Sequence, residues 1–329
     1  MLNIGLLGCG RIGQVHAKTI ERMGNVRLSA VADAFPQAAQ DLAKRTGAAV
    51  MDAADVIASP DVDAIIIATP TDTHYDLIHA AARAGKAIFC EKPVDLSSAR
   101  IRDCIKVVEK AGVPFLTAFN RRFDPNFASL QARLRDGEIG AVELVTILSR
   151  DPAPPPISYI ERSGGIFRDM MIHDFDMARF LLGEEPVQVF AVGSALVDPA
   201  IGAAGDVDTA AVTLTTARGA ICQITNSRRA TYGYDQRVEV HGSLGMLRAG
   251  NVMEHTVEVA NSSGFRTAPT LNFFLERYSE AYRIELVHFA DAVAAGTPIS
   301  PNITDGLKAQ ILADAAATSL ETGKAVSIG

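Results

Sequence analysis

A glycine-rich turn near the start of the chain constrains its fold more than any other feature. The sequence Gly8-Cys9-Gly10-Arg11-Ile12-Gly13 follows a short apolar run and leads into a helical pattern. In a strand–turn–helix unit the first glycine permits the tight turn, the second lets the backbone approach a pyrophosphate, and the third allows the helix to pack closely on the strand. The free N–H groups at the helix start favour the negative charge of that pyrophosphate. The turn therefore predicts a binding site for a nicotinamide or flavin dinucleotide.

An acidic residue after the next apolar run supports this interpretation and selects among cofactors. Asp33 follows the run 28–32 and lies twenty residues after Gly13. An acid at this spacing accepts hydrogen bonds from the ribose hydroxyls of NAD and repels the 2′-phosphate of NADP. Ala34 and Phe35 supply no arginine that would offset the repulsion. We expect NAD; the alternative is a solvated aspartate that merely ends a strand.

The first third of the chain alternates apolar runs with helical patterns. Continuous apolar runs, typical of buried parallel strands, occupy 64–68, 87–90 and 115–118, and a shorter strand is expected at 48–50. Helices are expected at 36–45, 53–58, 74–84 and 97–111, with Thr73 as the cap of the third. This alternation predicts an α/β fold with a doubly wound parallel sheet, a Rossmann fold, whose ligands bind at the carboxyl ends of the strands. The predicted cofactor-binding residues at these ends are Gly8, Gly10, Arg11, Ile12, Gly13, Asp33, Thr69, Pro70, Glu91 and Lys92.

The second half of the chain has a different pattern. Strand-like runs without intervening helices occupy 187–192, 210–216, 220–226 and 237–241, after an earlier run at 142–148. Such a succession predicts a large, mostly antiparallel sheet in an α+β domain. Helices are expected at about 167–182, 275–295 and 305–322. We place the boundary near Arg122, which gives an NAD-binding domain at 1–122 and a domain for substrate binding and oligomerisation at 123–329.

Composition excludes several classes of protein. The net charge of −7 over 329 residues gives no electrostatic footprint for nucleic acid. No apolar run approaches the roughly 20 residues of a membrane span. The four cysteines have no paired spacing, so neither a disulfide framework nor a metal site is indicated, and we expect buried, reduced thiols. Because the sequence starts directly on a predicted strand, with no room for a secretory signal, we expect a cytoplasmic protein.

Two groups of residues carry candidate chemistry. Lys92, directly after a buried strand, can hold a carbonyl or alkoxide oxygen by a charge-assisted hydrogen bond; alternatively it is a surface lysine paired with Glu91. Asp169 and His173 are four residues apart in the predicted helix 167–182, so they share one face. A carboxylate beside an imidazole fixes its tautomer and stabilises the imidazolium that forms when the ring accepts a proton. The alternative is a capping aspartate and a core histidine.

The chain resembles the glucose–fructose oxidoreductase/inositol dehydrogenase (Gfo/Idh/MocA) family, and most of all its inositol dehydrogenase branch. The resemblance covers nearly the whole chain and rests on the glycine turn and on the segments 68–70, 91–93, 119–124, 169–176, 231–235 and 277–282. It implies that Lys92, Asp169 and His173 form the catalytic group. It also implies that the substrate-binding residues are Lys92, Asp169 and His173 together with Arg122 (or Arg121), Asp151, Tyr232, Tyr234, Tyr278 and Tyr282. Ser163 stands where many members begin a three-glycine run, and Met171 replaces a glycine common in other branches.

The resemblance implies an enzyme that oxidises a secondary hydroxyl of a cyclic polyol, with His173 as base, Lys92 at the developing alkoxide and hydride transfer to NAD. Myo-inositol is the first expectation for the substrate, and 2-keto-myo-inositol for the product. A scyllo-inositol or sugar dehydrogenase of the same family is the alternative. A non-catalytic protein that senses NAD or a sugar is the alternative of another class, although a sensor needs no proton relay. A flavin enzyme would leave Lys92 and His173 without a role. By analogy with the family we expect a homo-oligomer, a dimer or a tetramer.

Overall fold

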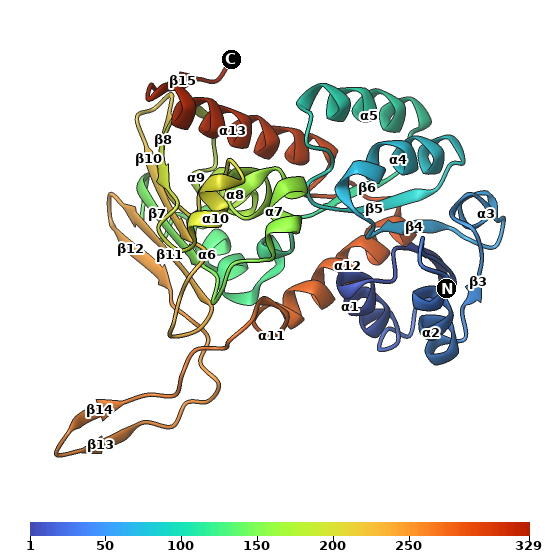
Figure 1. The fold of residues 1–329 in the computed structure, drawn as a ribbon, viewed down its shortest axis with the longest axis horizontal. Coiled ribbons are helices and arrows are strands. Elements are labelled where there is room, and N and C mark those ends of the chain that lie inside the picture. Colours follow the sequence, from blue (N-terminus) through green and yellow to red (C-terminus); the bar gives the residue numbers. More distant parts are fainter. The chain divides into compact units, whose positions relative to one another are not determined.

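The computed structural model describes residues 1–329, which divide into two compact units (Figure 1). The first unit consists of 1–123 and 281–310, and the second of 124–280 and 311–329. The division after Phe123 lies one residue from the boundary expected at Arg122. The division differs from the contiguous domains 1–122 and 123–329 because residues 281–310 return to the first unit.

The first unit is built on a six-stranded parallel sheet, which confirms the expected Rossmann fold. Its strands are β1 (Leu2–Leu7), β2 (Val26–Ala32), β3 (Ala49–Val50), β4 (Ala64–Ile67), β5 (Ala87–Glu91) and β6 (Phe115–Ala118). The spatial order is β3-β2-β1-β4-β5-β6, so the direction of winding reverses between β1 and β4. In doubly wound sheets the ligand binds outside the carboxyl ends of the strands at this reversal. The glycine turn, directly after β1, lies there.

The helices of the first unit are close to those expected. They are α1 (Arg11–Ile20), α2 (Pro36–Thr46), α3 (Ala53–Ala58), α4 (His74–Arg83), α5 (Ser98–Ala111), the greater part of α12 (Ser279–Ala295) and the start of α13 (Ile303–Thr322). The short 3₁₀ helices are η1 (Thr71–Thr73) and η2 (Asn120–Phe123). Thr73 occupies the cap position of α4, but its hydroxyl donates to the Pro70 carbonyl 2.8 Å away instead of capping the helix. None of the helices in the protein is long and apolar enough to cross a membrane.

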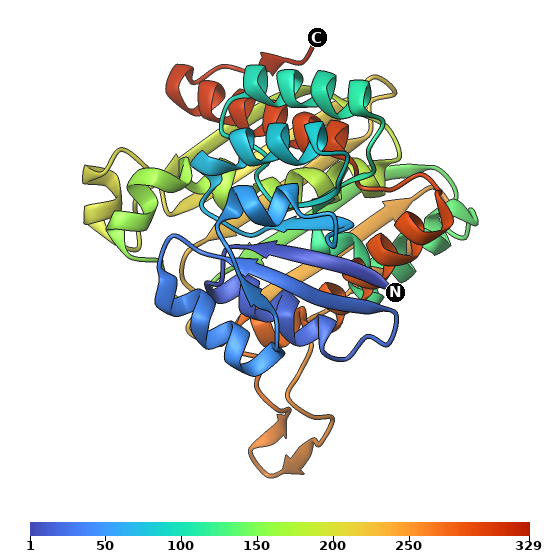
Figure 2. The same cartoon turned by 90° about the vertical axis from the view of Figure 1, so that its right-hand side faces the viewer.

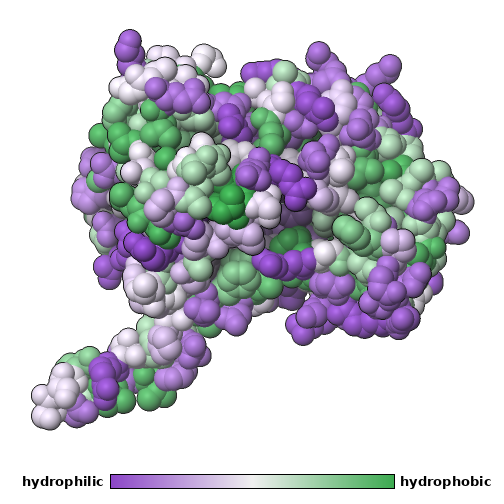
Figure 3. All heavy atoms as spheres, viewed as in Figure 1, coloured by the Kyte–Doolittle hydropathy of each residue, from purple (hydrophilic) through white to green (hydrophobic).

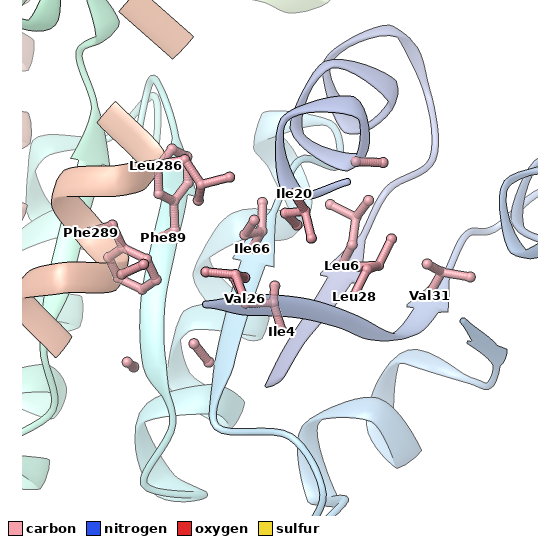
Figure 4. Packing of buried hydrophobic residues seen from close by; sticks show 14 of the residues in the cluster. Ile4, Leu6, Ile20, Val26, Leu28, Val31, Ile66, Phe89, Leu286 and Phe289 are labelled. Carbon is pink, nitrogen blue, oxygen red and sulfur yellow. The ribbon is translucent and has the colours of Figure 1, made fainter. Parts of the chain in front are cut away.

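Residues 281–310 join the first unit through the apolar face of α12. Leu286 and Phe289 are fully buried in the same core cluster as Ile4 and Ile66 of the sheet (Figure 4). The rings of Phe289 and Phe89 meet edge to face with centroids 5.6 Å apart. Burying side chains of this size stabilises a fold by roughly 1.5–3 kcal/mol each. The return of the chain is therefore driven by an apolar surface that the parallel sheet leaves for α12.

The second unit contains the large, mostly antiparallel sheet that the sequence predicted. Its strands are β7 (Val142–Arg150), β8 (Pro186–Ser194), β9 (Thr209–Thr216), β10 (Ile221–Ser227), β11 (Asp235–Gly242), β12 (Gly245–Ala249) and β15 (Val326–Ser327), in the order β12-β11-β7-β10-β9-β8-β15. Only β7 and β10 pair in parallel. The other helices are α6 (Pro125–Arg135), α7 (Ile157–Ser163), α8 (Gly165–Asp169), α9 (Ile172–Leu182), α10 (Pro199–Ala203) and α11 (Phe274–Arg277). A small hairpin, β13 (Val259–Asn261) and β14 (Gly264–Arg266), projects from this unit (Figures 1 and 2).

The helix expected at 167–182 is in fact two helices, α8 and α9. Met171 N donates to Ile166 O at 2.8 Å, a wide turn that separates α8 from α9. Asp169 is the last residue of α8, whereas His173 lies in the first turn of α9. The expectation that these two residues share one continuous helix face is therefore wrong.

Candidate active site

The glycine turn has the geometry that a dinucleotide pyrophosphate requires. Gly8 has φ +96°, and a Cβ atom there would lie 2.4 Å from the Ala68 carbonyl oxygen. A Cβ at Gly13 would lie 2.0 Å from the Gly8 carbonyl oxygen, so only glycine lets the start of α1 lie this close to the turn after β1. Nothing lies within 4 Å of a Cβ placed on Gly10, the N-cap of α1. The turn thus leaves open space beside the start of α1, where a pyrophosphate would bind.

Asp33 is fixed against the glycine turn. Its Oδ2 atom accepts a hydrogen bond of 2.6 Å from Cys9 N, and its Oδ1 atom accepts one of 2.8 Å from Phe35 N. Each carboxylate oxygen has a second lone pair, which can accept from a ribose hydroxyl. Burial, with Asp33 nearby, raises the pKa of the Cys9 thiol to about 11, so this thiol stays neutral beside the acid.

A buried histidine connects the turns that follow β4 and β5. His74 places Nε2 3.0 Å from Thr69 O and Nδ1 2.9 Å from Pro93 O. Burial lowers the pKa of His74. The histidine thus joins two backbone turns that carry predicted cofactor-binding residues, a role that no local sequence pattern revealed.

A histidine of helix α1 holds the side chain of Glu91, the neighbour of the half-buried Lys92. The Nε2 atom of His16 lies 2.7 Å from Glu91 Oε1, and the His16 side chain is fully buried. The carboxylate can only accept, so Nε2 carries the hydrogen. The His16 ring meets those of Phe89 and Tyr282 edge to face, with centroids 4.9 and 6.0 Å away. The sequence had singled out Tyr282 for substrate binding, but had assigned His16 no role.

Arg122 is also tied down within the first unit. Its Nη2 atom donates to Asp305 Oδ1 at 3.1 Å, and its side chain is only 9% exposed. Its Nη1 atom donates to the Ser300 hydroxyl at 3.4 Å, so the guanidinium has a fixed orientation. Arg121 is buried beside it.

The second unit carries Asp169 and His173. Asp169 Oδ1 accepts a hydrogen bond of 2.8 Å from the Tyr159 hydroxyl, and its Oδ2 atom lies 3.5 Å from Nη2 of Arg228. His173 is half-buried in the first turn of α9. The next residue, Asp174, is fully buried and accepts from Ser149 and Asn226 at 2.6 and 2.9 Å.

Asp174 therefore fixes the start of α9 on β7 and β10, and with it the position of His173. Sequence analysis missed this role. The available signal was an acidic residue among the apolar residues of a helix, a position at which a carboxylate needs buried partners.

The remaining substrate candidates of the second unit differ in their surroundings. Tyr234 and Tyr278 are buried, with ring centroids 6.0 Å apart, and the Tyr278 hydroxyl donates to Gln236 at 3.3 Å. Tyr232 is 51% exposed, and its hydroxyl donates to Asp235 at 2.6 Å. Asp151 follows β7 directly and is half-buried.

Two family profiles match the chain. Residues 2–119 match the oxidoreductase family with an NAD-binding Rossmann fold (GFO/IDH/MocA), and residues 127–248 match the GFO/IDH/MocA C-terminal domain. The chain is 54% identical to an inositol 2-dehydrogenase of Rhizobium meliloti, over 99% of each chain.

Solved structures resemble the chain over its full length. A crystal structure of a putative myo-inositol dehydrogenase from Sinorhizobium meliloti is 53% identical, with a TM-score of 0.98 and complete coverage of both chains. A scyllo-inositol dehydrogenase from Lactobacillus casei, solved with NAD(H) and scyllo-inositol, is 29% identical, with a TM-score of 0.93 and 99% coverage of both chains.

The anchored Asp33 carboxylate predicts a strong preference for NAD over NADP. The wild-type protein should show a kcat/KM for NAD at least about a hundredfold above that for NADP, because the carboxylate repels a 2′-phosphate. Asp33→Ser should reduce this preference. Asp41→Asn, which removes an exposed acid on α2, is the matched control and should not. Comparable wild-type efficiency with both cofactors would contradict the prediction.

Proposed function

The chain belongs to the GFO/IDH/MocA oxidoreductase family with an NAD-binding Rossmann domain, and we propose that it oxidises myo-inositol to 2-keto-myo-inositol with NAD. The observation that carries this proposal is the 54% identity, over almost the full length, with an inositol 2-dehydrogenase. The presence of Lys92, Asp169 and His173, residue types that can serve the proton transfer of alcohol oxidation, supports it.

In this proposal each catalytic residue has a defined task. His173 accepts the proton of the substrate hydroxyl, and Asp169 orients the imidazole and stabilises its cation. The Lys92 ammonium stabilises the developing alkoxide by a charge-assisted hydrogen bond. NAD, when bound, supplies the hydride acceptor.

Cofactor binding is assigned to the first part of the chain, in agreement with the open N-terminus of α1 and the anchored Asp33. The residues that would hold NAD are Gly8, Gly10, Arg11, Ile12, Gly13, Asp33, Thr69, Pro70, Glu91 and Lys92. We assign cofactor binding to 1–122 and substrate binding and oligomerisation to 123–329, with two exceptions. Arg122 remains a candidate for substrate binding, and 281–310, with Tyr282, completes the core of the first unit.

Recognition of a ring with a hydroxyl on every carbon requires many directional partners. The candidates besides Lys92, Asp169 and His173 are Arg122, Asp151, Tyr232, Tyr234, Tyr278 and Tyr282. A site that bonds each hydroxyl rejects analogues that lack one far better than an apolar pocket rejects bulk. The exposure of Tyr232 makes it the weakest of the six candidates.

Two alternatives are ranked below this proposal. A scyllo-inositol or sugar dehydrogenase of the same family is supported by the likeness to the Lactobacillus casei enzyme, but at 29% identity rather than 54%. A non-catalytic sensor of NAD or a sugar would require the same glycine turn. It would have no use for Lys92, Asp169 and His173, which the chain retains.

We also propose that the protein is a cytoplasmic homo-oligomer. Large apolar side chains are exposed on the seven-stranded sheet and on the projecting hairpin, among them Phe190, Val192 and Phe265. Figure 3 shows apolar residues, in green, on the hairpin. Surfaces of this kind mark association sites. All four cysteines are free and buried, which fits a reducing compartment.

Light scattering of the purified protein tests the proposed oligomer. It should give the mass of a dimer or a tetramer, and the mass of a monomer would refute the oligomer.

Lys92→Ala and His173→Ala should fold and bind NAD but lose turnover. Removing a general base typically lowers the rate by about 10²- to 10⁴-fold. Steady-state kinetics with myo-inositol, together with NAD titration and thermal unfolding, would measure this. The matched control is His241→Gln, which changes an exposed histidine paired with Glu143 and should leave turnover unchanged. Near-normal turnover of the His173 variant would assign proton abstraction to another residue.

A panel of substrates tests the proposed activity directly. Purified protein should reduce NAD with myo-inositol more efficiently than with scyllo-inositol, aldohexoses, pentoses or acyclic polyols, and simple alcohols should fail. Much higher efficiency with an aldohexose or scyllo-inositol would retain the dehydrogenase chemistry and replace the named substrate.

A further inference from the structure

The short helix that presents Asp169 cannot hold its own position. Helix α8 has only five residues, Gly165–Asp169, and isolated helices shorter than about twelve residues are marginal even in favourable sequences. Its placement must therefore come from contacts with the rest of the second unit. These contacts matter because Asp169 is its last residue.

A buried arginine lies between acidic groups at both ends of α8. Arg228, one residue after β10, is 1% exposed, and its backbone N–H donates to Asp208 O at 2.8 Å. Its Nη2 atom lies 3.5 Å from Asp169 Oδ2 and 3.9 Å from Asp206 Oδ2. A guanidinium is rarely buried unless anions compensate its charge, and these two carboxylates do so.

Asp206 holds the other end of the same helix. Its Oδ1 atom accepts a hydrogen bond of 3.0 Å from Ile166 N, in the first turn of α8. Gly165 has φ +79°, and a Cβ atom there would lie 2.7 Å from the same oxygen. Glycine is favoured at 165 by its left-handed backbone, and a Cβ there would displace the Asp206 carboxylate from its place beside α8.

We propose that Arg228 is the positioning residue of the catalytic carboxylate, because it fixes α8 through Asp206 and Asp169 and supplies the counter-charge of Asp169. This inference rests on the role assigned to Asp169 in the proposed function. Tyr159 donates to the other Asp169 oxygen, Oδ1, so the two oxygens have different partners and the carboxylate has a defined orientation. Arg168, the cation that belongs to α8 itself, is engaged elsewhere, because it pairs with Asp314 at 2.8 Å.

The charge of Arg228 has a consequence that a merely structural role would not have. Arg228 places a positive charge 3.5 Å from Asp169, and Asp206 places a negative charge 3.9 Å from the same guanidinium nitrogen. Without Arg228 the pair should hold its proton up to a higher pH. Because the reaction requires an unprotonated base, the acid limb of kcat/KM should then move to higher pH.

The test compares three variants in the oxidation of myo-inositol over a range of pH. Arg228→Met should lower kcat at least about tenfold, leave the KM for NAD unchanged and move the acid limb to higher pH, because it removes the charge beside the pair. Arg228→Lys retains the charge, so the acid limb of its kcat/KM profile should lie at the wild-type pH. Asp206→Asn keeps the acceptor for Ile166 N but removes the opposing charge, so the limb should move to lower pH.

Arg218→Met is the matched control, since it removes an exposed arginine paired with Glu184 and should change neither kcat nor the limb. The inference is refuted if Arg228→Met folds and retains the wild-type kcat and limb, or if all three variants move the limb in one direction. If Arg228→Met does not fold, the other two variants still test the inference. The inference is then refuted if the acid limb of Asp206→Asn lies at the same pH as that of the wild type.

The proposed function can fail independently of this inference. A wild-type protein that reduces no NAD with any cyclic polyol refutes the function. An active wild type whose variants behave like it refutes only the role of Arg228. NMR titration of the His173 ring needs no substrate and should show a midpoint at higher pH in Arg228→Met and at lower pH in Asp206→Asn.

Discussion

The close packing of helix α1 on strand β1 is the constraint on which the first unit depends. The approach is possible only because Gly13 has no Cβ, which would lie 2.0 Å from the Gly8 carbonyl. It sets the position of the helix start, where an anion can bind, and brings Cys9 N to the Asp33 carboxylate. The same helix carries His16, which bonds Glu91 at the end of β5. One backbone contact therefore orders both the glycine turn and the turn at 91–93, which carries Lys92.

The second unit uses buried polar pairs for the same purpose. Asp174 ties α9 to two strands, and Asp124 forms a buried ion pair with Arg277. Breaking a buried pair by removing one partner costs about 3–5 kcal/mol, because the other charge remains buried and uncompensated. Arg228, between Asp169 and Asp206, belongs to the same class. Such contacts require a unique arrangement of their elements, which suits a unit that must hold a carboxylate and an imidazole in fixed positions.

Local patterns predicted most elements of the parallel sheet. The apolar run at 64–68 could be read directly because a strand buried on both faces has no polar side chains. The helix at 167–182 was predicted as one element because its apolar spacing continues through Met170 and Met171. The break follows from the wide turn in which Met171 N donates to Ile166 O. Asp206, forty residues from Ile166, holds the start of α8 by accepting from Ile166 N. Helix α6, of 11 residues, was missed although Asp124 and Pro125 offer a helix-start signal, whereas the three-residue strands β13 and β14 are too short to show a pattern.

The sequence by itself determined the class of cofactor, the fold of the first 120 residues and the residue types available for catalysis, because each depends on neighbours along the chain. The tertiary structure decided that 281–310 returns to complete the first core, since the apolar face of α12 finds its partner only on the assembled sheet. It also decided which side chains hold the candidate catalytic residues. His16 bonds Glu91 75 positions away, Asp174 accepts from Asn226 52 positions away, and Arg228 pairs with Asp169 59 positions away. Partners so distant in sequence are selected by packing, which no local pattern encodes.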